Sequence, residues 1–478
     1  MRASVRRAGI DMRYKPLCLL LALAFATPAF AEDDVKTLSA ELKRLSERIE
    51  QLEKQNKEME NALATDRVSE QEPETATRLK AVEFQTLSMQ KQARQIEALE
   101  GITVGASLTS VIQGVNGRGS ASGDGESRAN YRGDISVTLP GGEMGNTEGK
   151  IFTQLRFGQG NGVSLRPTYT GTPNSTGFQV GSVASDDSFG VIAQAWYQLK
   201  VPLSDGRKED AREHVYVTFG KIDPFVFFDQ NSIADDESTK FLNNVFVHNP
   251  LLDSGGDIGS DAYGFEPGII VQYKNTRNKG ADWGLSLGVF SPSGTRTDNG
   301  ANFNGSLGDP LVIVQAERAV RWNYLPGNYR LYVWRNGQGV GYDDIERNHT
   351  GIGVSMDQKV TDNLTLFGRY GHEMSGKVMF DRAITAGAEL TGSKWGRAAD
   401  SLGVAFGALR TSSDFHDDSL SLYGYQASGW EKQLEIYYRF RVNSRFELTP
   451  DIQRIIRPGG DGSASGVTVV GLRAKVGF

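Results

Sequence analysis

Polar and hydrophobic residues alternate at a period of two along most of the chain, beginning at Ile102. Such alternation predicts β-strands with one face toward water and one apolar face. Sixteen stretches show it, so the sequence predicts an all-β fold. In chain order they are Ile102–Ile112, Tyr131–Leu139, Ile151–Phe157, Val191–Val201, Val215–Lys221, Ile269–Tyr273, Trp283–Phe290, Leu311–Val320, Tyr329–Arg335, Ile352–Met356, Leu364–Tyr370, Ile384–Leu390, Leu402–Ala408, Leu434–Val442, Phe446–Ile456 and Val467–Phe478.

The polar face of these strands carries charges at mid-strand. Lys150, Gln154 and Arg156 share one face of the third strand, and Arg439 and Arg441 lie on the polar face of the fourteenth. A soluble β-sandwich also alternates, but charges at mid-strand need a face that contacts water. A membrane barrel with a water-filled lumen and a lipid-facing exterior supplies both surfaces. We therefore predict a 16-stranded antiparallel transmembrane β-barrel over residues 101–478.

The connections between the predicted strands alternate in length. Long connections follow odd-numbered strands, and most of those after even-numbered strands are short. This is the pattern of an outer-membrane barrel with long external loops and short periplasmic turns. An even number of strands places both ends of the barrel in the periplasm. Alternation back from the terminal Phe478, with Arg473 and Lys475 on the lumen face, resembles the signal that barrel-assembly machinery recognises in its clients.

The segment before the strands predicts two further elements. Residues 1–31 combine a basic start, an apolar run and an Ala-Phe-Ala cleavage site, so they are expected to be a signal peptide. Apolar residues then recur every 3.5 positions over 35–63, and a weaker repeat follows a break near Pro73. This predicts a periplasmic coiled coil in two segments over 32–100. A single surface helix is the alternative for 35–63.

Amino-acid composition and net charge argue against some classes of function. The chain has 56 glycines, 38% hydrophobic residues and a net charge of −6, which falls to about −10 without residues 1–31. Glycine-rich turns suit many short strands, and an acidic chain argues against a nucleic-acid partner. The single cysteine, Cys18, lies in the predicted signal peptide. The mature protein is therefore expected to have no disulfide bond and no thiolate metal site.

The sequence contains no convincing enzyme motif, and no cofactor is expected. Gly284–Gly288 matches the serine-nucleophile pattern, but alternation runs straight through it, so Ser286 is expected to face the lumen. The five histidines lack metal-ligand spacing. Asp253, Asp257 and Asp261 could hold calcium, although a solvated acidic loop fits them better.

The acidic and aromatic stretch Lys221–Asp253 is too long for a turn, and long ordered loops often carry function. We predict that it contains a short helix capped by Asn231 or Ser232, and that a loop at about 222–264 folds into the lumen and narrows it. The expected pore-lining groups on the loop are Asp223, Asp229, Asn231, Asp235, Asp236 and Glu237. On the wall they are Arg156, Arg330, Arg369, Arg439 and Arg441, with Trp196, Tyr332 and Trp334 as inward aromatic faces for sugars. A lipid-facing girdle is the alternative for the aromatics.

Two stretches resemble a known family. One runs from Gly220-Lys221-Ile222-Asp223 to Asn249-Pro250; the other runs from Glu435-Ile436-Tyr437-Tyr438-Arg439-Phe440 to Phe478. Both are similar to the carbohydrate-selective outer-membrane porins of the OprB type. The resemblance covers roughly 102–478 and implies a homotrimeric barrel in the outer membrane of a Gram-negative cell, for passive uptake of small sugars. Two alternatives stay open: a porin for organic anions or peptides, and a coiled-coil tether to the cell wall with incidental transport.

Overall fold

The computed structural model describes residue 54 and residues 101–169, 173–178, 188–203, 211–252, 265–278, 280–291 and 308–478. The predicted signal peptide, almost all of the predicted coiled coil and the acidic cluster Asp253, Asp257 and Asp261 lie outside these residues. Every described strand belongs to one compact unit, Glu70–Phe478. No helix in the described part of the chain is long and apolar enough to cross a membrane.

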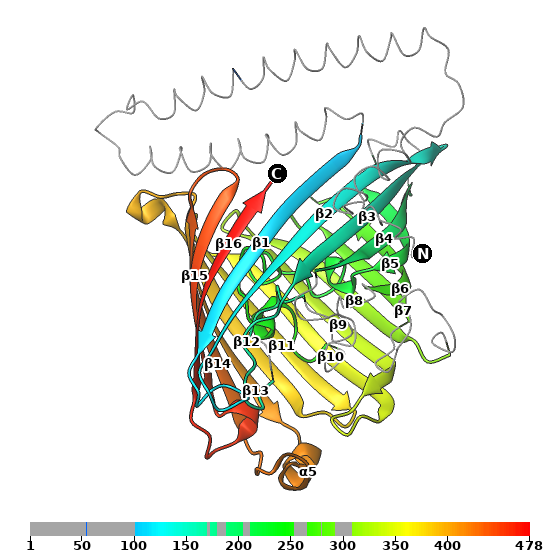
Figure 1. The fold of residues 1–478 in the computed structure, drawn as a ribbon. Helices are drawn as coiled ribbons and strands as arrows, with labels where there is room; N and C mark the ends of the chain where they lie inside the picture. Colours follow the sequence, from blue (N-terminus) through cyan, green and yellow to red (C-terminus); the bar gives the residue numbers. More distant parts are fainter. Residues whose placement is uncertain are drawn as a thin grey trace, which may run out of the picture. The chain divides into compact units, whose positions relative to one another are not determined.

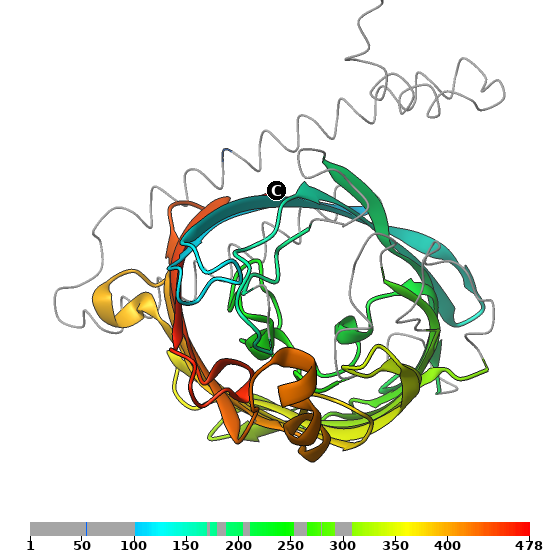
Figure 2. The same ribbon diagram turned by 60° about the horizontal axis from the view of Figure 1, so that its bottom comes forward.

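Sixteen antiparallel strands form a closed barrel, as the alternation predicts (Figures 1 and 2). Each strand pairs with its neighbours in sequence, and β1 pairs with β16 from Ser107–Gly477 to Val115–Val469. Closure leaves no strand edge unpaired. The strands are β1 (Thr103–Val115), β2 (Glu126–Met144), β3 (Thr147–Gln159), β4 (Phe189–Pro202), β5 (Glu213–Ile222), β6 (Glu266–Asn275), β7 (Trp283–Phe290), β8 (Leu311–Trp322), β9 (Leu325–Val340), β10 (Glu346–Lys359), β11 (Leu364–Ser375), β12 (Phe380–Thr391), β13 (Ser401–Thr411), β14 (Trp430–Arg441), β15 (Phe446–Ile456) and β16 (Val467–Gly477).

The outward face of the barrel is apolar. Ile112, Leu331 and Val470 are each more than half exposed in the isolated chain, at 58%, 51% and 54%. So many exposed aliphatic side chains on one surface suit contact with lipid. The inward face carries polar groups instead: Ser286 is buried and accepts a hydrogen bond from the Gln272 amide. Ser286 therefore faces inward, as the alternation predicts.

The two ends of the barrel differ in the length of their connections. Two residues join β2 to β3 and β8 to β9, and Gly145 makes the first of these turns with a φ of 60°. Much longer segments follow β3, β5 and β13, and the last of them contains α5 (Ser413–Tyr423). We call the two ends the short-turn end and the long-loop end. Figure 1 shows the C-terminus at the short-turn end and α5 at the long-loop end.

The connection after β5 contains two short helices, η2 (Pro224–Val226) and α4 (Asn244–Val247). The predicted helix capped by Asn231 or Ser232 is wrong, because the helix begins at Asn244 and Asn243 caps it. The Asn231 side chain instead accepts the Ile233 N–H and donates to the Met356 carbonyl. Asn and Asp side chains close turns as readily as they cap helices. Asp236 behaves in the same way, since it accepts the Ser238 N–H at 2.9 Å.

The hydrophobic core lies between this connection and the inner face of the barrel. Phe228, Phe241 and Phe246 are buried against side chains from the wall. Their wall partners lie on strands between β4 and β14 and include Phe290, Tyr332, Trp334, Phe367 and Tyr437. The apolar packing therefore occupies one side of the barrel interior.

Candidate functional site

The segment Asp223–Leu252, which we call the inner segment, contacts strands on several sides of the barrel. Its side chains and backbone bond to inner faces of β2, β9, β11, β12, β14 and β16. Figure 2 shows the green ribbon that holds η2 and α4 within the ring of strands. The site is therefore built from one long connection and the polar face of the wall.

A buried ion pair anchors the inner segment to β11. Asp229 and Arg369 lie 3.0 Å apart, and neither side chain is exposed to solvent. The Tyr332 hydroxyl donates to Asp229 at 2.7 Å, and the Asn249 N–H donates to the other carboxylate oxygen at 2.6 Å. Arg369 also donates to the Phe246 carbonyl. With no exposed surface, Asp229 and Arg369 hold the segment in place rather than lining a channel, contrary to the sequence prediction.

Three further contacts hold the middle of the inner segment. Glu435 on β14 accepts the backbone N–H groups of Leu242 and Asn243 at 2.5 and 2.9 Å. Lys240 pairs with Glu389 on β12 at 2.5 Å. The Lys240–Glu389 bond is charge-assisted, and such bonds are stronger than neutral ones. Together the three contacts fix the backbone of the segment against the wall.

The predicted aromatic residues face inward but lie under the inner segment. Trp196 is 7% exposed, stacks on Phe152 at 4.8 Å and meets the edge of Phe227. Trp334 and Tyr332 are buried in the same hydrophobic cluster. Their inward orientation agrees with the alternation, yet their rings serve packing and offer almost no surface to a solute.

A cavity of about 620 Å³ lies against the opposite wall. Arg132 and Asp134 on β2, with Gln154 and Arg156 on β3, form part of its lining. The inner segment contributes four acids, Asp223, Asp235, Asp236 and Glu237. Of the sequence-predicted site residues, these four and Arg156 are brought together here.

A second cavity of about 530 Å³ adjoins the first toward the short-turn end. The two share Ser107, Asp134 and Gln154 in their linings. Arg441 lines the second cavity and pairs with Glu447, which lines it too. The two cavities together follow the wall of β16, β1, β2 and β3, on the side that the apolar packing leaves free.

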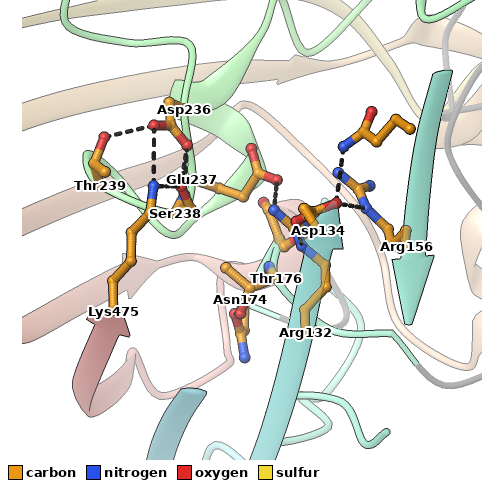
Figure 3. A network of polar contacts seen from close by, with 12 residues as sticks. Arg132, Asp134, Arg156, Asn174, Thr176, Asp236, Glu237, Ser238, Thr239 and Lys475 are labelled. Atoms are coloured by element: carbon orange, nitrogen blue, oxygen red, sulfur yellow. Dashed lines mark hydrogen bonds and ion pairs between the residues drawn. The ribbon is translucent and has the colours of Figure 1, made fainter. Parts of the chain in front are cut away.

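A chain of alternating charges crosses the first cavity (Figure 3). Asp134 accepts bonds from Arg156 at 2.7 Å and Arg132 at 3.1 Å, and Arg132 pairs with Glu237 at 2.6 Å. Beyond Glu237, Lys475 on β16 donates to the Ser238 hydroxyl at 2.6 Å. The network ties the inner segment to β2 and β16 and fixes the charged groups in position.

A cluster of aromatic and acidic side chains lies beside this chain of charges. The rings of Phe225 and His248 stack with centroids 3.7 Å apart and planes 5° from parallel. His248 Nδ1 lies 3.4 Å from an Asp235 oxygen, and Asp223 caps η2 by accepting the Phe225 N–H. Burial raises the pKa of Asp223 to about 6 and also raises the pKa of Asp235. Part of the negative charge in the cavity therefore titrates near neutral pH.

Three other predicted residues, Arg330, Asn231 and Arg439, lie outside the first cavity. Arg330 donates to the Gln230 carbonyl at 2.7 Å and lines a separate cavity of about 250 Å³. Asn231 is buried and bonds to β10. Arg439 lies on β14 within electrostatic range of Glu389 and Glu447. These three residues therefore lie outside the charge chain that crosses the first cavity.

Arg132 and Asp134 are central to the site, yet the sequence analysis did not select them. Both lie on the polar face of the second predicted strand, so alternation alone could have identified them. Lys475 was placed on the lumen face but was not chosen as a site residue. No group of three or more His, Cys, Asp or Glu residues in the described part of the chain could hold a metal ion.

A comparison with models of known protein families shows which family the chain belongs to. Residues 71–478 match the model of the carbohydrate-selective porin, OprB family. The chain belongs to the OprB family. The family and the barrel fold are those of outer-membrane porins, which are typically channels without enzymatic activity. A comparison with curated protein sequences found no match.

Solved structures agree with the fold. The high-pH structure of Pseudomonas putida OprB matches with a TM-score of 0.61 and 17% identity, covering 81% of this chain and 96% of that one. Its low-pH structure matches with a TM-score of 0.46 and 16% identity, covering 81% and 95%. The outer membrane channel DcaP of Acinetobacter baumannii matches with a TM-score of 0.45 and 12% identity, covering 79% and 97%. At 17% identity, the likeness to the high-pH structure supports the barrel fold alone.

Proposed function

We propose that this OprB-family porin carries small neutral sugars by passive diffusion along the β16–β3 wall, and that the inner segment forms the constriction. The observation that supports this is the one-sided interior. Apolar packing fills the side of β4–β14, and the polar cavities follow the other side. A solute then passes between fixed charges on β2 and β3 and the acids of the inner segment.

The chemistry of the cavity suits a polyhydroxylated solute. Arg132, Asp134 and Gln154 present donors and acceptors at fixed positions, which can exchange bonds with hydroxyl groups as water leaves. Phe225 and Val226 supply apolar surface beside them for C–H groups. No step requires a cofactor or an energy source, because diffusion is downhill.

The charge count argues against organic anions as the preferred solutes. Among the described residues that line the first cavity there are five carboxylates and two guanidinium groups. An excess of fixed negative charge repels anions from a narrow aqueous passage. The peptide alternative, the homotrimer, the assembly-machinery partner and the tethering coiled coil stay predictions, and nothing in the described residues favours one of them.

Liposome swelling tests the proposal. Vesicles containing the purified protein are placed in isotonic glucose, glucosamine or gluconate, which share a carbon skeleton and differ in charge. We expect glucose and glucosamine to enter faster than gluconate. Entry of gluconate with exclusion of glucose would overturn the proposal in favour of an organic-anion porin. Vesicles without protein are the control for leakage.

A further inference from the structure

The outer faces of β12, β13, β14 and β15 share one pattern. Each has four successive outward positions that are apolar, followed toward the long-loop end by a basic residue. The apolar sets are Leu390, Ala388, Ala386 and Ile384 on β12; Leu402, Val404, Phe406 and Ala408 on β13; Phe440, Tyr438, Ile436 and Leu434 on β14; and Phe446, Leu448, Pro450 and Ile452 on β15. The basic residues, which we call the basic belt, are Arg382, Arg410, Lys432 and Arg454.

Strand register places the belt on the lipid-facing side. Arg382 is paired directly with Arg410 across β12 and β13. Lys432 is paired with Ile456, two residues beyond Arg454 on the same face of β15. Ile456 and its neighbour Ile452 are 46% and 45% exposed, as expected of outward positions. The four basic side chains therefore follow one another around the outside of the barrel.

Most of the positive charge in the belt is not neutralised by the protein. Arg410 pairs with Asp381. Arg454 donates to two neutral groups, the Gly466 carbonyl and the Thr468 hydroxyl. No acidic residue in the described part of the chain forms an ion pair with Arg382, Lys432 or Arg454. The belt thus presents three uncompensated positive charges, on β12, β14 and β15.

The neighbouring wall lacks this feature. On β16, which follows β15, the corresponding outward positions are Val470 and Thr468. On β1 they are Ile112 and Gly114. Outward basic residues near the long-loop end also occur on other strands, such as Arg335 on β9, which lies 4.0 Å from Asp309. The belt differs in that four consecutive strands each carry one.

We propose that the basic belt binds the phosphate groups of an anionic glycolipid in the outer leaflet of the outer membrane. The four apolar positions mark the hydrocarbon region, so the belt lies where headgroups begin. Guanidinium and ammonium groups form charge-assisted bonds with phosphate oxygens. A second copy of the same face is a poor partner for this surface, because like charges would meet. The inference rests on the family's outer-membrane location and is independent of the solute that the channel carries.

Native mass spectrometry of the full chain in neutral detergent tests the inference. The probes are lipid A with two phosphate groups and the same lipid after enzymatic removal of both. The test variant is K432Q/R454Q, which removes two exposed charges. The matched control is R318Q/K394Q, which removes one Arg and one Lys that are exposed toward the short-turn end.

We expect the test variant to bind phosphorylated lipid A at least about tenfold more weakly than the wild type, because each charge-assisted bond is strong. The control should bind as the wild type does, and the dephosphorylated lipid should bind all three proteins equally weakly. Equal loss in both variants, or equal binding of the two lipids, would overturn the inference. So would a change in oligomeric state in K432Q/R454Q with unchanged lipid binding, because the belt would then be a protein interface. Retained sugar entry in K432Q/R454Q shows that the variant is folded and separates this test from that of the proposed function.

Discussion

Arg132 on β2 and Glu237 on the inner segment form an ion pair of 2.6 Å across the first cavity. The side chains are 5% and 17% exposed, so the pair lies at the edge of the solvent. Arg132 also bonds to Asp134, which in turn holds Arg156. The pair therefore couples the position of the inner segment to the charges of the wall.

Replacing Glu237 with Gln should change selectivity more than stability. The variant removes one carboxylate from a cavity with an excess of acids, so the preference for cations over anions should fall. The measurement is the reversal potential in a salt gradient across a planar bilayer. Glu126, which pairs with the 60% exposed Arg128, offers a matched control as E126Q. An unchanged reversal potential in E237Q would contradict the role of this residue in the passage.

The buried pair Asp229–Arg369 should dominate the stability of the inner segment. Replacing Asp229 with Asn leaves the Arg369 charge buried without its partner, which costs about 3–5 kcal/mol. The matched control is R277Q, since Arg277 is 67% exposed in its pair with Glu213 and such pairs contribute about 0–1 kcal/mol. Denaturant unfolding of the refolded barrel measures the free energy of unfolding of both variants. Equal midpoints for D229N and R277Q would be inconsistent with the anchoring role.

Channel selectivity should depend on pH through Asp223. Its pKa is raised to about 6 by burial, so the carboxylate is charged at pH 7.5 and mostly neutral at pH 5. As pH falls through this range the cavity loses negative charge, and the preference for cations should weaken with a midpoint near pH 6. The variant D223N should lose this part of the dependence. The control D417N alters an acid on α5 and should keep the wild-type profile; a profile unchanged in D223N would count against the assignment.

The strands could be predicted because each has two different solvents on its two faces. In β7, Leu285 and Leu287 face outward and Ser286 faces inward. The sequence shows this contrast as an alternation of apolar and polar residues with a period of two. Closure follows from the even number of strands and the amphipathic last strand. The same alternation also predicts which charged residues of the wall, such as Arg132, face the lumen.

The path of the inner segment could not be predicted in the same way. Asp229 and Arg369 are 140 residues apart in sequence, and no periodicity links them. The α4 helix has four residues, which is too short to show a helical repeat. Asn231 resembles a helix cap in sequence, yet it closes a turn and bonds to β10. Which of the inward side chains stay exposed depends on where this segment packs, and Trp196 and Trp334 were misjudged for that reason.

The central claim is that the inner segment forms the constriction of the passage. It is tested most directly by attaching a bulky thiol reagent to Asp236→Cys in a Cys18→Ser background, where no other cysteine is present. Asp236 is 50% exposed and lines the first cavity, so the reagent can reach it. Asp417→Cys on α5, whose native side chain is 80% exposed, is the control, because it lies at the long-loop end and does not line the first cavity. The measurement is single-channel conductance before and after complete modification, verified by mass. The account predicts a large fall in conductance for D236C and none for D417C; full conductance in fully modified D236C would contradict it.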